Sequence, residues 1–301
     1  MSDNNTEYWR SQVEDIKGDR SHGSGYLSNQ ALDIIGEFIE KKMYKNRTEL
    51  LQSLAKLSNA LVRAKPLMAL IYNRSQHIID FIQDLPKDEK DINKIRYMAL
   101  DELKAVRKIA EKRIQRITQF GSKVIMDHHV ILIHSYSKLV ELILMEAKKH
   151  KKRFKVICTE SRPLLEGSKM ALNLSKAGIK TTLIPDADLA RAVNETHFVL
   201  TGTDRITETT FISKTGTHAI AVLTHHMNKP FYIVGESDKI LLKRTFPVRF
   251  LKSDVKELCD QKNDNLTVSN KYFEETPISF LHKLINEDGI FELKEFVDRY
   301  L

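Results

Sequence analysis

The stretch Val199-Leu200-Thr201-Gly202-Thr203-Asp204-Arg205-Ile206, followed shortly by Lys214-Thr215-Gly216-Thr217, decides the fold of this chain. Its first residues continue the apolar run from Phe198, which is typical of a buried parallel strand. In open α/β sheets, ligands bind beyond the carboxyl ends of the strands, which places Asp204 at the rim of a binding site. A surface turn with an exposed aspartate is the alternative interpretation.

The segment from Lys214 leads into a predicted helix over 219–227. A helix start with small residues and a neighbouring lysine suits an anionic group, because unpaired backbone N–H groups and the helix dipole favour negative charge there. Asp204 and Lys214 together therefore predict a pocket for a polar, phosphorylated small molecule. A helix cap without a ligand is the alternative that spacing leaves open.

The residues around this stretch alternate between strand and helix patterns. Strand patterns cover 130–133, 154–158, 180–184, 197–200 and 230–234, and helix patterns cover 138–147, 166–177, 187–193, 219–227 and 291–301. Such alternation implies right-handed crossovers and a parallel sheet. We therefore predict a Rossmann-like α/β domain over residues 121–301.

The preceding part of the chain predicts a helical bundle instead. Apolar stripes at helical spacing indicate helices over 29–42, 47–64, 67–81 and 92–119. Ser28 is the predicted N-cap of the first of them. The predicted fold class is thus α/β, with a helical N-terminal domain over 1–120 and the Rossmann-like parallel-sheet domain after it.

Composition narrows the class of protein. Hydrophobic residues make up 42% and charged residues 29% of the 301 residues, as in soluble globular proteins. No apolar run reaches the ~20 residues of a membrane span, and the polar start Met1–Glu7 has no signal core. The two cysteines form neither a disulfide framework nor a metal cluster. We expect a cytoplasmic protein without a membrane partner, metal or cofactor.

The net charge of +8 is compatible with nucleic acid, acidic partners or a lysine-rich surface. The densest cluster, 148–153 with Lys155 beyond it, joins a predicted helix to a predicted strand. It has no interleaved aromatic residues, which favours a solvated loop. No nucleic-acid-binding module is recognisable, so no direct nucleic-acid contact is expected.

Polar residues also follow two other predicted strands. His134-Ser135-Tyr136-Ser137 follows strand 130–133, and Thr159-Glu160-Ser161-Arg162-Pro163 follows strand 154–158. Arg162 offers a planar fork of donors that suits phosphate, and its alternative role is an ion pair with an acid such as Glu160. The sequence contains no Gly-x-Ser-x-Gly elbow, no P-loop and no Gly-x-Gly-x-x-Gly turn.

At these strand ends the sequence resembles the alpha, beta and delta subunits of translation initiation factor 2B and their sugar-phosphate isomerase relatives. The resemblance is carried by Ile131–Ser137, Thr159–Pro163, Thr201–Ile206, Ser213–Thr217, Lys229–Val234 and Tyr272–Pro277. It implies a helical N-terminal domain, a Rossmann-like C-terminal domain and a homodimer formed through the latter. The implied partners are the other initiation factor 2B subunits and initiation factor 2.

The resemblance has two branches. The isomerases, which act on methylthioribose 1-phosphate or ribose 1,5-bisphosphate, use a cysteine and an aspartate as their acid/base pair. Asp204 matches the aspartate, but Ser135 stands in the place of the cysteine. A hydroxyl is far less acidic than a thiol and needs an adjacent base to act near neutral pH. The 134–137 segment resembles the regulatory alpha subunit instead.

Other positions match the isomerases only in part. The turn His22-Gly23-Ser24-Gly25 resembles the isomerases' phosphate-binding turn, with His22 in place of an arginine. Its alternative role is a flexible joint. Lys65 also replaces an arginine, and Glu166 replaces a glutamine, which puts a carboxylate where a neutral amide would face the ligand. Asp204 and Lys214 are retained.

The predicted function is that of a non-catalytic regulatory subunit resembling the alpha subunit of this guanine-nucleotide exchange factor, which binds a sugar phosphate or nucleotide monophosphate. The alternatives are an aldose–ketose isomerase of sugar phosphates, in which Asp204 is catalytic, and a phosphorylated-metabolite sensor without a role in translation. The predicted ligand-binding residues are His22, Gly23, Ser24, Gly25, Lys65, Ser135, Glu160, Arg162, Asp204 and Lys214.

Overall fold

The structure, a computed structural model, describes residues 4–261 and 263–301. It divides into two compact units, one ending at Lys112 and the other spanning Arg113–Leu301, and the division falls within helix α5 (Ile92–Lys123). The first three residues of the polar start, Met1–Asp3, lie outside the described residues. In the part of the chain that is described, no helix is both long and apolar enough to cross a membrane.

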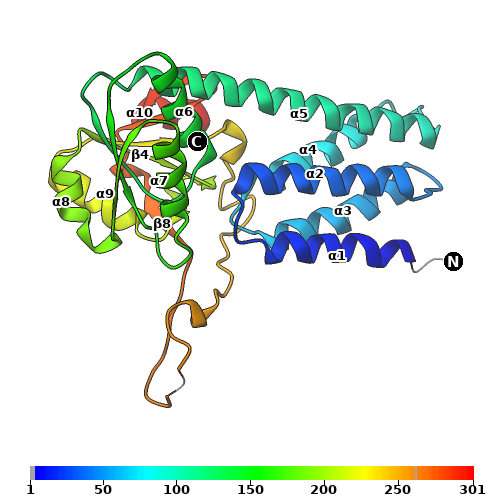
Figure 1. Cartoon of the computed structure of the whole chain (residues 1–301). Helices are drawn as coiled ribbons and strands as arrows, with labels where there is room; N and C mark the ends of the chain where they lie inside the picture. The colour runs from blue at the N-terminus through cyan, green and yellow to red at the C-terminus, as the bar shows by residue number, and fades with distance from the viewer. Residues whose placement is uncertain (1–3, 262) are drawn as a thin grey trace. The chain divides into compact units, whose positions relative to one another are not determined.

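The first unit consists of helices (Figure 1). They are α1 (Asn4–Gly18), α2 (Ser24–Lys41), α3 (Arg47–Ala64), α4 (Ala69–Asp84) and the first part of α5. Their apolar stripes form the core, in which residues such as Leu27, Leu50, Leu57, Ile78 and Ile95 are fully buried. The four predicted helices are confirmed, and α3 has the predicted bounds. The helix over Asn4–Gly18 was not predicted.

The predicted N-cap at Ser28 is wrong. Helix α2 begins at Ser24, with Gly23 as its N-cap, so Ser28 lies inside the helix and is buried. The hydroxyl of Ser28 donates to the carbonyl oxygen of Gly25 at 3.0 Å and accepts from Nη1 of Arg74 at 2.8 Å. A serine can bond back to the preceding turn in this way inside a helix, and the sequence pattern does not distinguish this from capping.

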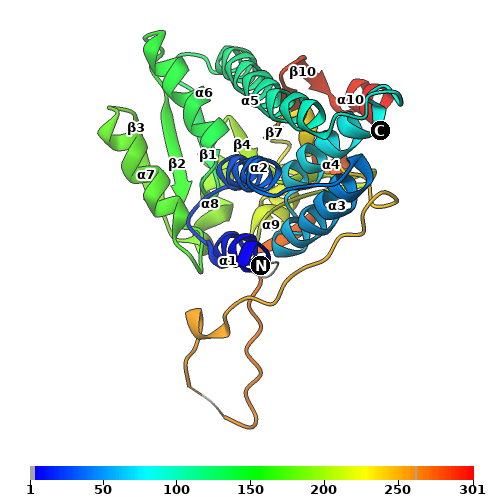
Figure 2. The same ribbon diagram turned by 90° about the vertical axis from the view of Figure 1, so that its right-hand side faces the viewer.

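The second unit is built on a seven-stranded sheet in the order β10-β9-β7-β4-β1-β2-β3 (Figure 2). The strands are β1 (Val130–Ile133), β2 (Lys155–Thr159), β3 (Lys180–Ile184), β4 (Phe198–Gly202), β7 (Phe231–Val234), β9 (Lys283–Asn286) and β10 (Gly289–Glu292). All neighbouring pairs are parallel except β9 and β10. The predicted α/β class is confirmed.

Helices cover both faces of this sheet. They are α6 (Lys138–Lys149), α7 (Glu166–Lys176), α8 (Leu189–Glu195), α9 (Thr217–His226) and α10 (Leu293–Tyr300). Along β1, Ile131 and Ile133 pack with α6 and α7, whereas Leu132 belongs to the cluster with α8, α9 and α10. Successive strand residues point to opposite faces, so a run that is apolar throughout produces two cores.

The C-terminal region contains more strands than predicted. A second sheet joins β5 (Arg205–Ile206), β6 (Thr210–Lys214) and β8 (Phe273–Pro277), so all of the Tyr272–Pro277 motif except its first residue is a strand. The predicted closing helix starts too early: Phe291 lies in β10, opposite Leu284 of β9, and α10 begins at Leu293. The alternation in 289–292 is too short to separate from helical periodicity by pattern alone.

Candidate functional site

The chain order of the sheet reverses between β1 and β4, because β2 and β3 lie on one side of β1 while β4 and β7 lie on the other. Ligands bind at such switch points, beyond the carboxyl ends of the strands. Ser135 follows β1 and Asp204 follows β4. The two turns touch, since a Cβ atom built on Gly202 would lie 2.5 Å from Oγ of Ser137.

Ser135, Glu166 and Lys214 form a polar cluster at this point. The hydroxyl of Ser135 donates to Oε1 of Glu166 at 3.1 Å, and Nζ of Lys214 lies 2.5 Å from the same oxygen. The side chain of Lys214 is 4% exposed and that of Glu166 22% exposed. The carboxylate that replaces the expected amide therefore pairs with the lysine that was predicted to bind the ligand.

Hydrogen-bonding capacity in this cluster is unfilled. Oε2 of Glu166 and Nζ of Lys214 are buried, and neither has a hydrogen-bond partner of acceptable geometry among the described residues. Leaving such atoms unsatisfied costs free energy comparable to a lost hydrogen bond. The cluster is therefore suited to receive a polar ligand group or ordered water beside the ion pair.

A chain of hydrogen bonds fixes the turns that carry the cluster. Nε2 of His134 lies 2.9 Å from the carbonyl oxygen of Thr215, and Nδ1 lies 2.6 Å from the hydroxyl of Thr159. The neutral ring thus carries its proton on Nε2, because a carbonyl can only accept. The hydroxyl of Ser161 lies 3.0 Å from that of Thr159 and accepts from the backbone N–H of Ser135 at 2.8 Å. Ser135 and Ser161 both have positive φ.

Burial lowers the pKa of His134 from its ordinary 6.5. The unfolded chain therefore takes up a proton first as the pH falls, and the free energy of unfolding should drop below pH 6.5 by up to ~1.4 kcal/mol per pH unit. We expect urea denaturation of the wild type at pH 7.5 and 5.5 to show this loss. His134→Gln should be less stable at both pH values but show a smaller pH-dependent difference. An equal difference in both proteins would contradict the assignment.

Asp204 lies in the turn between β4 and β5 and is partly exposed. Its backbone N–H donates to the carbonyl oxygen of Ile212 at 2.9 Å, and its carboxylate has no hydrogen bond or ion pair with any described residue. Buried Lys239 donates from Nζ to the carbonyl oxygen of Thr203 at 2.6 Å. Sequence reasoning missed Lys239, although 236–239 follows β7 as a polar run at a strand end.

Glu160 and Arg162 lie in the turn after β2. Hydrogen bonds to Asp186 stabilise this turn. The carboxylate of Asp186 accepts the backbone N–H groups of Ser161 at 2.8 Å and Arg162 at 2.7 Å. The exposed guanidinium of Arg162 donates to the carbonyl oxygen of Glu257 at 2.9 Å. No ion pair with Glu160 occurs among the described residues.

The start of α9 already binds a carboxylate of the chain. Oε1 of Glu274 in β8 accepts the backbone N–H groups of Gly216 at 2.7 Å and His218 at 2.8 Å. Two N–H groups of the helix start that was predicted to face a phosphate thus bind an internal side chain. Sequence reasoning missed Glu274 because β8 is distant in the chain.

The remaining predicted residues lie in the helical unit. Gly23 caps α2, and Ser24 and Gly25 form its first turn, so this segment is a helix start rather than a joint. Asp19 organises the residues that precede α2. Its Oδ2 lies 2.7 Å from Nδ1 of His22, and its carbonyl oxygen accepts from Nζ of Lys65 at 2.6 Å. His22 and Lys65 therefore both contact Asp19, one through its carboxylate and the other through its carbonyl oxygen.

A sequence profile of the Initiation factor 2 subunit family matches residues 20–293. The chain belongs to this family. A structure from Pyrococcus horikoshii titled as translation initiation factor eIF-2B superposes with a TM-score of 0.79, at 27% identity over 95% of this chain and 97% of that one.

Relatives of the family carry two kinds of name. Translation initiation factor eIF2B subunit alpha of Dictyostelium discoideum is 33% identical over 195 residues, 58% of this chain and 59% of its own length. Ribose 1,5-bisphosphate isomerase of Methanocaldococcus jannaschii is 25% identical over 282 residues, 92% of this chain and 89% of its own length. Membership in the initiation factor 2 subunit family therefore does not decide between binding and catalysis.

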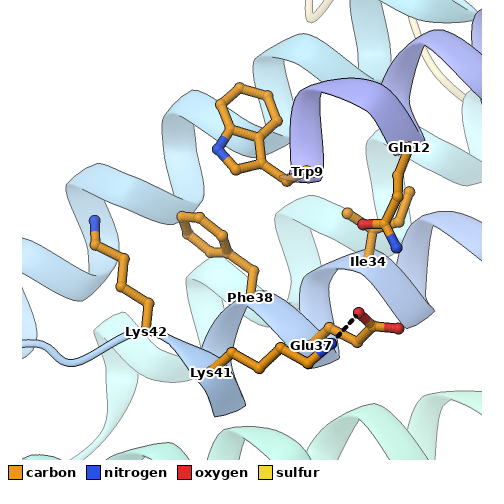
Figure 3. Close-up of a pocket in the computed structure, with 7 residues that line it drawn as sticks. All are labelled: Trp9, Gln12, Ile34, Glu37, Phe38, Lys41 and Lys42. Atoms are coloured by element: carbon orange, nitrogen blue, oxygen red, sulfur yellow. Dashed lines mark hydrogen bonds and ion pairs between the residues drawn. The ribbon is translucent and has the colours of Figure 1, made fainter. Parts of the chain in front are cut away.

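A small hollow lies between α1 and α2 (Figure 3). Trp9 and Phe38 meet there edge to face at 6.4 Å, and Lys41 pairs with Glu37 at 2.8 Å. Its volume of about 10 Å³ is enough for about one water molecule. This hollow is therefore no candidate for a sugar phosphate.

Proposed function

We propose that this protein is a non-catalytic regulatory member of the initiation factor 2B group that binds a sugar phosphate or nucleotide monophosphate at the β1–β4 switch point. Asp204 would contact the sugar hydroxyls and Lys214 the phosphate. Arg162, Glu160 and Ser135 would line the same pocket.

One observation carries the choice of binding over turnover. At the position where the isomerases have a thiol, the hydroxyl of Ser135 is bonded to a carboxylate that is itself ion-paired with Lys214. An ion-paired carboxylate is a weak base, and a hydroxyl rarely ionises near neutral pH. The cluster can hold a polar ligand, but it supplies no efficient second acid or base.

An isomerase of ribose 1,5-bisphosphate or methylthioribose 1-phosphate is the second candidate. The observation in its favour is the carboxylate of Asp204, which is unpaired among the described residues and lies at the switch point. The isomerase names among the relatives give this candidate equal support from family membership. Asp204 would then be the catalytic residue.

As partners we propose a second copy of the chain, forming a homodimer, and, where the source encodes them, the other initiation factor 2B subunits and initiation factor 2. We propose a cytoplasmic location, because translation initiation takes place there. The role needs no cofactor.

Glu166→Gln should strengthen binding of ribose 1,5-bisphosphate about 10-fold. The amide keeps an oxygen that can accept from Ser135 and Lys214, but it removes the charge that competes with a phosphate for the lysine. Charge-assisted hydrogen bonds are each worth about 1.5–3 kcal/mol, so a tenfold change, about 1.4 kcal/mol, is a conservative expectation. Isothermal titration calorimetry with both proteins measures it.

The control is Glu195→Gln, which removes an exposed ion pair with Arg191 (2.9 Å) on α8 and should leave the affinity unchanged. If Glu166→Gln binds more weakly than the wild type, Glu166 contacts the ligand directly and the assignment of Lys214 to the phosphate is wrong. If neither protein binds sugar phosphates or nucleotide monophosphates, the proposed function itself fails.

A further inference from the structure

A hollow of about 610 Å³ lies at the amino-terminal ends of β1, β2 and β3. These three strands are neighbours in the sheet (Figure 2). This edge is opposite the one that carries Ser135 and Asp204, because the strands are parallel. The loops after α6 and α7 form its walls, and Gly178, with φ +76°, contributes no side chain. Small-molecule sites have volumes of about 300–1,000 Å³, so the hollow can hold a ligand of nucleotide size.

The lining of this hollow is strongly basic. Its cationic side chains are those of Lys148, Lys151, Lys152, Arg153, Lys155 and Lys180. The carboxylate of Asp127 lies beside it and accepts the backbone N–H of Arg153 at 2.7 Å. The carboxyl ends of α6 and α7 add about half a negative charge each. These groups offset about two of the six cations, so a large positive charge remains.

Most of this positive charge is not used by the fold. Nζ of Lys152 donates to the carbonyl oxygens of Ser122 at 2.8 Å and Ile125 at 2.6 Å, which is a structural role. The other five cations form no ion pair with any carboxylate in residues 4–261 and 263–301. By contrast, Lys138 at the other end of α6 pairs with its own helix, 2.8 Å from Glu141.

Two of these five cations face each other directly. Lys155 of β2 and Lys180 of β3 are partners in the strand register, and both are exposed. Like charges opposite each other on neighbouring strands destabilise a sheet. Unfavourable charge pairs that no acidic side chain offsets are expected mainly at functional sites. The pair is therefore expected where its charge serves to bind a ligand.

We propose that this hollow binds a compact polyanion of the oligophosphate class, either a free oligophosphate or the phosphate chain of a nucleoside triphosphate. The number of unpaired cations matches several negative charges, and the volume matches a small molecule. A single-stranded nucleic acid is disfavoured because Phe154 is buried, which leaves His128 as the aromatic ring of the lining that a base can reach. The inference is independent of the proposed function, since the two sites share no residue.

The test is calorimetry of the full chain with inorganic tripolyphosphate. Lys155→Gln/Lys180→Gln should weaken binding at least 10-fold, because two charge-assisted contacts are lost. Removing the repulsion should leave the melting temperature unchanged or higher, which separates lost binding from lost folding. The control Lys108→Gln/Lys294→Gln removes the same charge from two exposed lysines elsewhere and should keep the wild-type affinity.

Titration with ATP identifies the source of the phosphates. Tighter binding of ATP than of tripolyphosphate would support a nucleoside triphosphate, and equal binding a free oligophosphate. An equal loss in the control variant would overturn the proposal in favour of diffuse charge attraction. Loss of binding in Lys214→Gln, with the lysine pair without effect, would place the anion at the switch point instead. Tighter binding of a short single-stranded RNA than of tripolyphosphate would make the surface a nucleic-acid site.

Discussion

Wild-type protein incubated with ribose 1,5-bisphosphate or methylthioribose 1-phosphate is expected to form no appreciable ketose product. Isomerisation of an aldose phosphate needs a proton donor and a proton acceptor at the sugar, and Asp204 can take one of these roles. Ser135 cannot take the other, because its hydroxyl is bonded at 3.1 Å to a carboxylate already paired with Lys214. The loss of a positioned acid or base typically lowers a rate by ~10²–10⁴-fold. Nuclear magnetic resonance of the sugar carbons detects the product directly.

Variants at Ser135 make this result specific. Ser135→Cys should restore a trace of turnover, since a thiol ionises far more readily than a hydroxyl. Ser135→Ala is the matched control and should remain inactive while still binding the sugar phosphate. Robust turnover by the wild type that Asp204→Asn abolishes would overturn the proposed regulatory function and make the protein an isomerase with a different second group.

Gly167→Ala should lower the free energy of unfolding by about 3 kcal/mol or more. Gly167 is the second residue of α7, and a Cβ atom built on it would lie 1.9 Å from the carbonyl oxygen of Thr159 and 2.7 Å from Oγ of Ser161. The first is a backbone atom at the end of β2, so relief requires α7 to move away from the sheet. Overpacking costs typically about 1–3 kcal/mol, and a clash with backbone belongs at or above the upper limit. Urea denaturation measures the change.

The matched control for this prediction is Gly36→Ala in the interior of α2. A Cβ atom there would meet Cδ1 of Leu103 at 3.6 Å, which is an ordinary contact. Alanine favours a helix over glycine by roughly 0.5–1 kcal/mol, so this variant should be as stable as the wild type or more so. Similar small effects of both substitutions would mean that α7 does not pack on β2 as closely as described.

Much of the fold was predictable because its long elements have one dominant period. The apolar stripe of Arg47–Ala64 repeats at helical spacing over its whole length, and Lys180–Ile184 is bounded by clear turn signals, so both were predicted with the observed bounds. Short elements carry too few residues for a period, so the strand at Phe291 was mistaken for helix. The cap at Ser28 failed because its hydroxyl has partners inside the bundle that no local pattern reveals.

The candidate site was predictable only as far as strand ends reveal it. Ser135, Asp204 and Lys214 follow or end short apolar runs, so topology places them at one edge of the sheet. The pairing of Ser135 with Glu166 was not predictable from spacing. It depends on positive φ values at Ser135 and Ser161 and on the close approach of α7 to β2, which are properties of the folded backbone.

The carboxylate of Glu274 at the start of α9 has a consequence for the timing of synthesis. The two backbone N–H groups that it accepts belong to residues made 58 and 56 positions earlier in the chain. At about 5–20 residues per second on a ribosome, Glu274 is added to the chain several seconds after the first residues of α9. During that interval the helix start is open to solutes in its surroundings, and the arrival of β8 closes it. The nascent chain thus exposes an anion-accepting helix end that the finished protein reserves for its own side chain.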